Sequence, residues 1–198
     1  VSIKNLEEIY PEASRLYIED EEFNNLAKSI NKQLNENEQE LINKWKKLKI
    51  ISIDSIKNVL EVLNHRFDIW KGESDVNHLI PEMINNLINA EKISLDEGAY
   101  VSNLETDPKI LITKSDGSYL YLTTDLATVL DRLKENKIDK TLYIVDKRQQ
   151  LHFKQLFSSI DYFQFSKKEF IHVEFGTIND INGKPFKTRE GDTKKLIE

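Results

Sequence analysis

The chain has 198 residues, 39% of them hydrophobic, and a formal net charge of −6. That length allows one large domain or two small ones with a real core. The sequence has no cysteine, no apolar run long enough to cross a bilayer and no signal-peptide pattern, and its four histidines lack metal-ligand spacing. These features exclude disulfides and thiolate sites, and we expect a cytoplasmic protein with no protein-bound metal and no membrane partner. The negative charge argues against a generally basic nucleic-acid surface, but it permits a local basic stripe.

Up to about residue 93 the sequence predicts helices, because apolar residues recur every three or four positions. The clearest runs occupy residues 23–34, 41–48 and 53–63. The polar segment 35–39 is expected to connect the first two runs, and Ser52 or Asp54 to cap the third. Pro81 suits the first turn of a further helix.

Segment 67–75 reads Phe-Asp-Ile-Trp-Lys-Gly-Glu-Ser-Asp. Phe67 and Ile69 alternate with polar residues, which predicts a short strand, and Gly72 predicts a turn. We favour a structural role, in which Phe67 and Trp70 fill a core, over a ligand role, because no acid or base is paired with them.

From Gly98 the period changes from helical to alternating, and residues 99–104 and 110–114 are strand-like. Asp116-Gly117 is a strong hairpin signal that would join the second strand to residues 118–122. We therefore divide the chain into a mainly helical region, 1–95, and a second region, 96–198.

Strand-like and helical patterns alternate through the second region. Strand-like residues 119–122 are followed by a helical pattern to Leu133, a strand at 142–145, a helix at 151–160 and a strand at 170–175. This order predicts the α/β class with a parallel sheet, in which the short apolar strand 142–145 is buried on both faces. In such sheets, ligands bind beyond the carboxyl ends of the strands.

Polar side chains are expected at that edge. Asp125 is predicted in the first turn of a helix and Gln149 at the following strand-to-helix turn, so both would face one crevice. The carboxylate, the amide and the imidazole of His152, brought together there, form a polar pocket, and Tyr121, predicted on a strand, can present its hydroxyl to it. A carboxylate can pair bidentately with a planar guanidinium. Taken singly, Asp125 also stabilises the helix dipole and Tyr121 suits ordinary strand packing.

Three segments together resemble arginyl-tRNA synthetase, a class I aminoacyl-tRNA synthetase. They read Tyr-Leu-Tyr-Leu-Thr-Thr-Asp at 119–125, Val-Asp-Lys-Arg-Gln-Gln-Leu-His-Phe at 145–153 and Gly-Lys-Pro-Phe-Lys-Thr-Arg at 183–189. The resemblance implies the second half of a Rossmann-like nucleotide-binding fold, preceded by a mainly helical insertion of the catalytic domain. It also implies an arginine–tRNA ligase, expected as a monomer. The full enzyme would activate L-arginine with ATP and Mg²⁺, release pyrophosphate, and transfer arginine to tRNA(Arg).

The resemblance assigns roles to particular residues. In the family, the positions matching Tyr121, Asp125 and Gln149 contact the arginine substrate. His152 is implied to lie near the nucleotide, and Gly176 beside the adenine, where a glycine permits close approach.

Residues 185–189 look like the family's version of the class I signature loop Lys-Met-Ser-Lys-Ser. Thr188 stands where the second lysine is usual. We expect Lys184, Lys187, Thr188 and Arg189 to lie at the ATP phosphates, where the cations neutralise charge on the departing pyrophosphate. Without the family context, the same stretch is a solvated basic loop.

The His-Ile-Gly-His-like motif of class I synthetases is absent from these 198 residues. We therefore expect an internal fragment of a larger enzyme, inactive in isolation because half of the ATP site is missing. The alternative is a synthetase-like binding or regulatory module without ligase activity. A third possibility, a nucleotidyltransferase for another small molecule, is disfavoured because an uncharged substrate would leave Asp125 unpaired.

Overall fold

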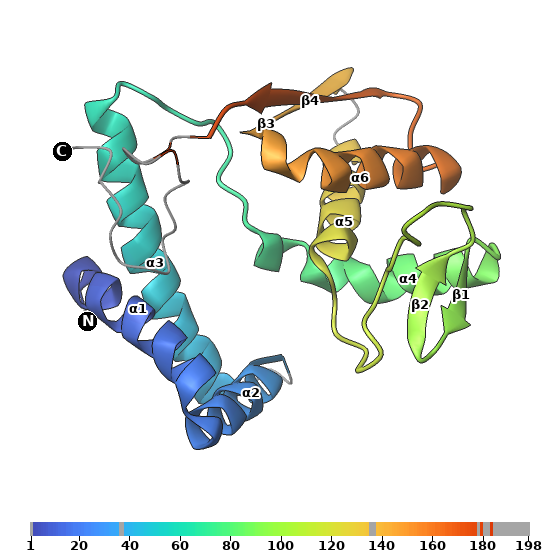
Figure 1. The fold of residues 1–198 in the computed structure, drawn as a ribbon. Coiled ribbons are helices and arrows are strands. Elements are labelled where there is room, and N and C mark those ends of the chain that lie inside the picture. Colours follow the sequence, from blue (N-terminus) through green and yellow to red (C-terminus); the bar gives the residue numbers. More distant parts are fainter. Residues whose placement is uncertain (1, 36–37, 135–137, 178, 180–182, 184–198) are drawn as a thin grey trace. The chain divides into compact units, whose positions relative to one another are not determined.

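The structure is a computed structural model that describes residues 2–35, 38–134, 138–177, 179 and 183 (Figure 1). Its α-helices are α1 (Ile3–Glu19), α2 (Glu21–Asn35), α3 (Gln39–Val62), α4 (Ile80–Asn89), α5 (Tyr121–Leu133) and α6 (Gln150–Tyr162). Its strands are β1 (Ile93–Asp96), β2 (Ala99–Ser102), β3 (Lys140–Asp146) and β4 (Glu169–Phe175). Short 3₁₀ turns are η1 (Glu73–Asp75), η2 (Asn77–Leu79) and η3 (Lys147–Gln149). The chain divides into two compact units between Asp68 and Ile69.

The first unit is built from α1, α2 and α3, which contact one another pairwise. A capping box starts α1, since the Ser2 hydroxyl accepts from the Asn5 N–H and the Asn5 side chain accepts from the Ser2 N–H. The helix α3 runs unbroken past Ser52 and Asp54. The two helices predicted at 41–48 and 53–63 are therefore one helix, so the predicted break between them was wrong.

The segment that follows α3 forms no strand. Phe67 is 58% exposed and Trp70 is 41% exposed. Gly72 has extended backbone angles, φ −117° and ψ 170°, and leads directly into η1. The predicted strand, the predicted turn at Gly72 and the core role for the two aromatic residues were all wrong.

The helix α4 opens the core of the second unit. Pro81 lies in its first turn, as predicted, and its apolar face buries Ile80, Met83, Ile84 and Leu87. This helix belongs to the unit Ile69–Thr177. The division of the catalytic domain at residue 95 into an insertion and a Rossmann-like half remains a prediction.

A small antiparallel sheet follows α4. The strands β1 and β2 pair from Ile93↔Ser102 to Asp96↔Ala99. Glu97 (φ 47°) and Gly98 (φ 83°) both have positive φ, as a two-residue type I′ turn requires. The sequence prediction included β2 but missed β1.

The hairpin predicted at Asp116-Gly117 is confirmed as a tight turn. Gly117 has φ +79°, and the Lys114 N–H donates to the Ser118 carbonyl at 2.9 Å. The flanking segments are shorter than predicted, because they form isolated bridges, Val101↔Leu111 and Thr113↔Tyr119, instead of continuous strands.

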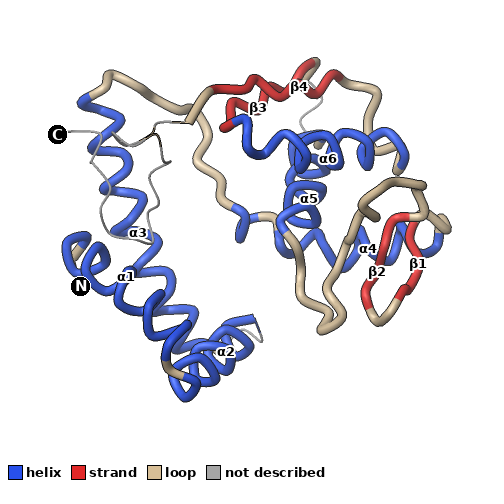
Figure 2. The backbone as a smooth tube through the Cα atoms, viewed as in Figure 1, coloured by secondary structure: helices blue, strands red, loops and turns tan. Residues whose placement is uncertain are grey.

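The strands β3 and β4 form a parallel pair joined through α6, a βαβ unit (Figure 2). The expected α/β class and parallel pairing are confirmed. One face of this sheet packs against α6, where the Tyr143 ring lies 4.9 Å from the Phe153 ring. On the other face, Leu142 is 52% exposed and Ile144 is 68% exposed. The prediction that this strand is buried on both faces was therefore wrong for the described part of the chain.

Residues from α4, α5, α6 and the loop before α5 share one hydrophobic core. Its most deeply buried apolar members, each 0–1% exposed, are Ile80, Ile110, Ile112, Leu126, Ala127, Val129 and Leu156. This core fixes α5 against α6, and with it the positions of the polar side chains that these two helices carry.

Candidate functional site

The helix α5 carries two of the predicted arginine-binding residues and begins earlier than expected. Tyr121 is its first residue, so it lies on a helix and not on a strand, and its side chain is 74% exposed. Asp125 lies one turn later, on the same side of the helix. It is therefore in the second turn, not the first.

A threonine explains why the helix begins at Tyr121. The Thr123 hydroxyl accepts from the Leu120 N–H at 3.3 Å and donates to the Ile112 carbonyl. It therefore satisfies one free N–H at the helix N-terminus and joins α5 to the preceding loop. Thr123 is fully buried. It acts from inside the first turn of the helix, and Leu120 is the N-cap residue.

The structure brings Asp125 together with His152 of α6. The His152 Nε2 lies 2.7 Å from the Asp125 Oδ2, and the two side chains are 24% and 33% exposed. His152 is also held by an edge contact with Phe153, with ring centroids 5.2 Å apart. Among the described residues, His152 is the hydrogen-bond partner of the Asp125 carboxylate. The sequence predicted that this carboxylate and this imidazole share one pocket, but it did not predict the hydrogen bond between them.

Gln149 closes η3 immediately before α6 and is exposed. It lies three residues before His152, so it is close to one turn earlier along the same side of the chain. Each member of the Asp125–His152 pair thus has a predicted arginine-binding residue about one turn before it. Within the described part of the chain, no hydrogen bond or ion pair joins Gln149 to Tyr121 or to Asp125, and their shared role stays a prediction.

An aspartate fixes the backbone in front of Gln149. The Asp146 carboxylate accepts from the Arg148 N–H at 2.8 Å, and from the Arg148 Nε and Nη2 at 3.0 Å each. These hydrogen bonds from Arg148 hold the pKa of Asp146 below its usual range. The Asp146 carboxylate therefore holds both the backbone and the side chain of Arg148 in the turn between β3 and α6.

Tyr143 and Arg132 also lie near the pair, and the sequence reasoning missed both. The Arg132 Cζ is 5.4 Å from the Tyr143 ring centroid. Burial raises the pKa of Tyr143, Arg132 opposes the rise, and the Asp125 carboxylate adds to it. Tyr143 is therefore expected to stay protonated. No sequence signal separates these residues from ordinary strand and helix positions, because the fold alone brings them together.

The residues predicted for ATP differ in what the structure shows of them. Gly176 follows β4 and is exposed, and a Cβ placed there would meet no atom of the described residues within 4 Å. The described residues therefore do not require glycine at this position, and its role beside the adenine stays a prediction. Lys184, Lys187, Thr188 and Arg189 lie outside the described residues.

Two shallow hollows lie near the small antiparallel sheet, with volumes of about 500 and 470 Å³. None of the predicted site residues lines either hollow. Across the described ranges, no group of three or more His, Cys, Asp or Glu side chains is arranged to hold a metal ion. Nor is any described helix both long and apolar enough to span a membrane.

Comparison with known proteins gives concordant matches. A family model described as "tRNA synthetases class I (R), catalytic domain" matches residues 1–198. The chain is 40% identical over 202 residues to an arginine–tRNA ligase of Francisella tularensis subsp. novicida, covering 100% of this chain and 35% of that protein. An arginine–tRNA ligase of Agathobacter rectalis is 37% identical, over 98% of this chain and 34% of that protein. The chain thus spans about a third of the length of these curated relatives.

Solved structures agree on the fold. The crystal structure of arginyl-tRNA synthetase from Plasmodium falciparum matches with a TM-score of 0.68 at 21% identity, over 82% of this chain and 32% of that one. A putative arginyl-tRNA synthetase from Campylobacter jejuni matches with a TM-score of 0.56 at 19% identity, over 84% of this chain and 38% of that one.

Proposed function

The chain belongs to the catalytic-domain family of class I (R) tRNA synthetases, and we propose from this that the protein containing it is an arginine–tRNA ligase. Its substrates are L-arginine, ATP with Mg²⁺, and tRNA(Arg). We further propose that it works in the cytoplasm as a monomer, and that residues 1–95 and 96–198 form the insertion and the second Rossmann-like half of the catalytic domain.

The observation that carries the proposal is the position of Asp125. Its carboxylate is two-thirds covered, one oxygen bonds His152, and Tyr121 precedes it by one turn. A guanidinium offers several N–H donors in a plane, which suits a carboxylate whose second oxygen has no hydrogen-bond partner among the described residues. Tyr121 and Gln149, both exposed, would complete the arginine site by accepting from the remaining donors.

His152 links the arginine side to the nucleotide side in this proposal. Its imidazole fixes the orientation of the Asp125 carboxylate, while its position on α6 places it beside the end of β3. Gly176 follows the neighbouring end of β4, where the absence of a side chain leaves room for the adenine. Lys184, Lys187, Thr188 and Arg189 would lie along the triphosphate.

The reaction follows from these placements. An oxygen of the arginine carboxylate attacks the α-phosphorus of ATP, the bond to the β-phosphate oxygen breaks, and pyrophosphate leaves with its electrons. The arginyl adenylate then passes its acyl group to a hydroxyl of the terminal adenosine of tRNA(Arg), and AMP leaves. The residues described here bind and orient arginine, and the basic loop offsets the charge that collects on pyrophosphate.

The test is arginine-dependent, tRNA-dependent exchange between pyrophosphate and ATP by the full-length protein. We expect exchange with arginine and none above background with lysine, citrulline or glutamine. Citrulline is the sharpest control, because it has nearly the shape of arginine but no positive charge for Asp125. Exchange driven by another amino acid, or by none, would overturn the assignment and favour a binding module.

A further inference from the structure

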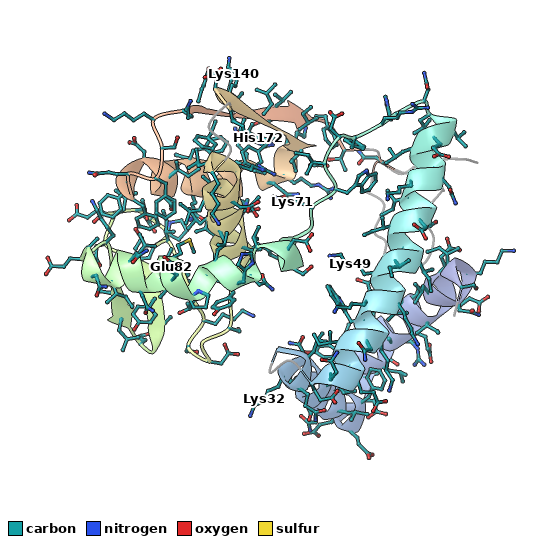
Figure 3. The ribbon with its side chains drawn as sticks, turned by 180° about the vertical axis from the view of Figure 1, so that it is seen from behind. Lys32, Lys49, Lys71, Glu82, Lys140 and His172 are labelled. Carbon is teal, nitrogen blue, oxygen red and sulfur yellow. The ribbon has the colours of Figure 1, made fainter. Side chains whose placement is uncertain are left out.

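His172 is a buried histidine in a strand, and its side chain bonds the backbone of the neighbouring strand. It lies in the middle of β4, opposite Tyr143 of β3, and its side chain is 7% exposed (Figure 3). Its ring points to the face of the sheet that packs against α6, where it lies 4.5 Å from the Phe153 ring at an interplanar angle of 34°. An imidazole buried this deeply needs a polar partner, because its ring nitrogens otherwise lose their hydrogen bonds to water.

That partner is the backbone of the neighbouring strand. The His172 Nε2 is 3.0 Å from the carbonyl oxygen of Val145. A carbonyl can only accept, so the hydrogen is on Nε2. The Nδ1 nitrogen is buried without a hydrogen-bond partner among the described residues, 3.6 Å from the Glu174 Oε1. The single hydrogen bond of His172 thus goes to the carbonyl of Val145.

Val145 lies just before the turn that carries Gln149. It is the next-to-last residue of β3, and Asp146, η3 and Gln149 follow directly. The β3–β4 pairing runs to Asp146↔Phe175, so the backbone of β3 is already held against β4. The bond from His172 adds a side-chain contact at the start of the turn. Because the same ring packs on Phe153, the neighbour of His152, it connects the end of β3 to α6 as well.

We propose that His172 is a positioning residue for the arginine site: it holds the end of β3, and through it Gln149, in register with the Asp125–His152 pair. The inference rests on the proposed function. It adds a residue that touches no substrate. Its bond goes to β3, which leads to Gln149, so we expect its loss to act on arginine; an effect through β4 and Gly176 or through His152 would also reach ATP.

A matched pair of variants of the full-length protein tests this role. His172→Gln keeps an N–H donor close to the position of Nε2, whereas His172→Asn places its amide at the position of Nδ1, too short to reach Val145. Both remove the ring and leave a polar side chain of similar character. Phe157→Leu is the control, because Phe157 packs on Phe153 and Tyr143 in the same aromatic layer without a polar contact to β3.

We expect His172→Asn to raise the KM for arginine about five- to tenfold over His172→Gln, the effect of one lost hydrogen bond. The KM for ATP and the kcat of exchange should stay within about twofold in both variants. Phe157→Leu should leave the KM for arginine within about twofold of wild type.

Each other outcome overturns the inference. Equal KM values for arginine in the Gln and Asn variants, a parallel rise in the KM for ATP, or the same effect in Phe157→Leu would reduce His172 to a packing residue. So would loss of cooperative thermal unfolding in either His172 variant. Failure of the proposed function is distinct, because then the wild-type protein itself shows no arginine-dependent exchange.

Discussion

The sharpest prediction concerns the charge on Asp125. Replacing Asp125 by Asn in the full-length protein keeps the size of the side chain and a hydrogen-bonding partner for His152, but it removes the negative charge. A hydrogen bond to a charged group contributes about 1.5–3 kcal/mol. The carboxylate is 33% exposed and its Oδ2 already bonds His152, so we take about 2 kcal/mol, which corresponds to a rise of about 30-fold in the KM for arginine.

The assay is pyrophosphate exchange at varied arginine, with ATP and tRNA saturating. The KM for ATP should stay within about twofold, because the charge faces arginine and not the phosphates. Thermal unfolding of the same preparations checks that the variant is folded. A KM for arginine within about twofold of wild type in a folded variant would refute the assignment of Asp125, since a paired charge cannot be removed at so little cost.

Three further changes test how the site is supported. Leu126→Ala, at a residue that is 0% exposed, should lower the free energy of unfolding by about 2–5 kcal/mol in urea titration; a smaller change would mean that α5 does not rest on this core. Thr123→Val should cost about 1–3 kcal/mol, because it leaves the Ile112 carbonyl and the Leu120 N–H without their partner, while Thr123→Ser should retain most of the stability. Asp146→Ala should lower the melting temperature and raise the KM for arginine, and Asp146→Asn should do less of both. The pKa of Asp146 is lowered in the folded protein by Arg148, so its contribution is fully present above the pKa of the unfolded carboxyl and is lost as the pH falls through the lower folded value. A wild-type and an Asp146→Asn protein with the same acid dependence of melting would contradict this.

Periodicity was a good guide wherever one face of an element is buried. It predicted α4 from Pro81 and the apolar residues after it, and it predicted the parallel pairing of β3 with β4. It was misleading at α3, where Ser52 and Asp54 suggested the start of a new helix. A polar residue can cap a helix or lie on the solvent side of a continuing one, and single-sequence patterns do not separate the two.

The start of α5 shows a different limit. The alternation in residues 118–122 predicted a strand, yet the helix begins at Tyr121. The deciding interaction is the bond from the Thr123 hydroxyl to the carbonyl of Ile112, eleven residues earlier. A local pattern does not contain this contact. The strand β1 was missed for a more ordinary reason, because the Glu97-Gly98 turn was not recognised as a type I′ signal.

Part of the candidate site could likewise be predicted from the sequence, and part depends on contacts between distant segments. Residue types and strand order predicted that Asp125 and His152 share one pocket, but the 2.7 Å contact between them depends on how α5 packs against α6. This packing also explains the spacing of the other two residues. In a helix, side chains tilt toward the N-terminus, so Tyr121 lies toward the start of α5 from Asp125, and Gln149 lies toward the start of α6 from His152. We propose that a ligand bound by Asp125 also meets the exposed Tyr121 hydroxyl and the exposed Gln149 amide. We therefore expect arginine to be preferred over lysine, because a planar guanidinium carries five N–H donors that can pair bidentately with the carboxylate and still reach separated acceptors, whereas an ammonium carries its three donors on one nitrogen.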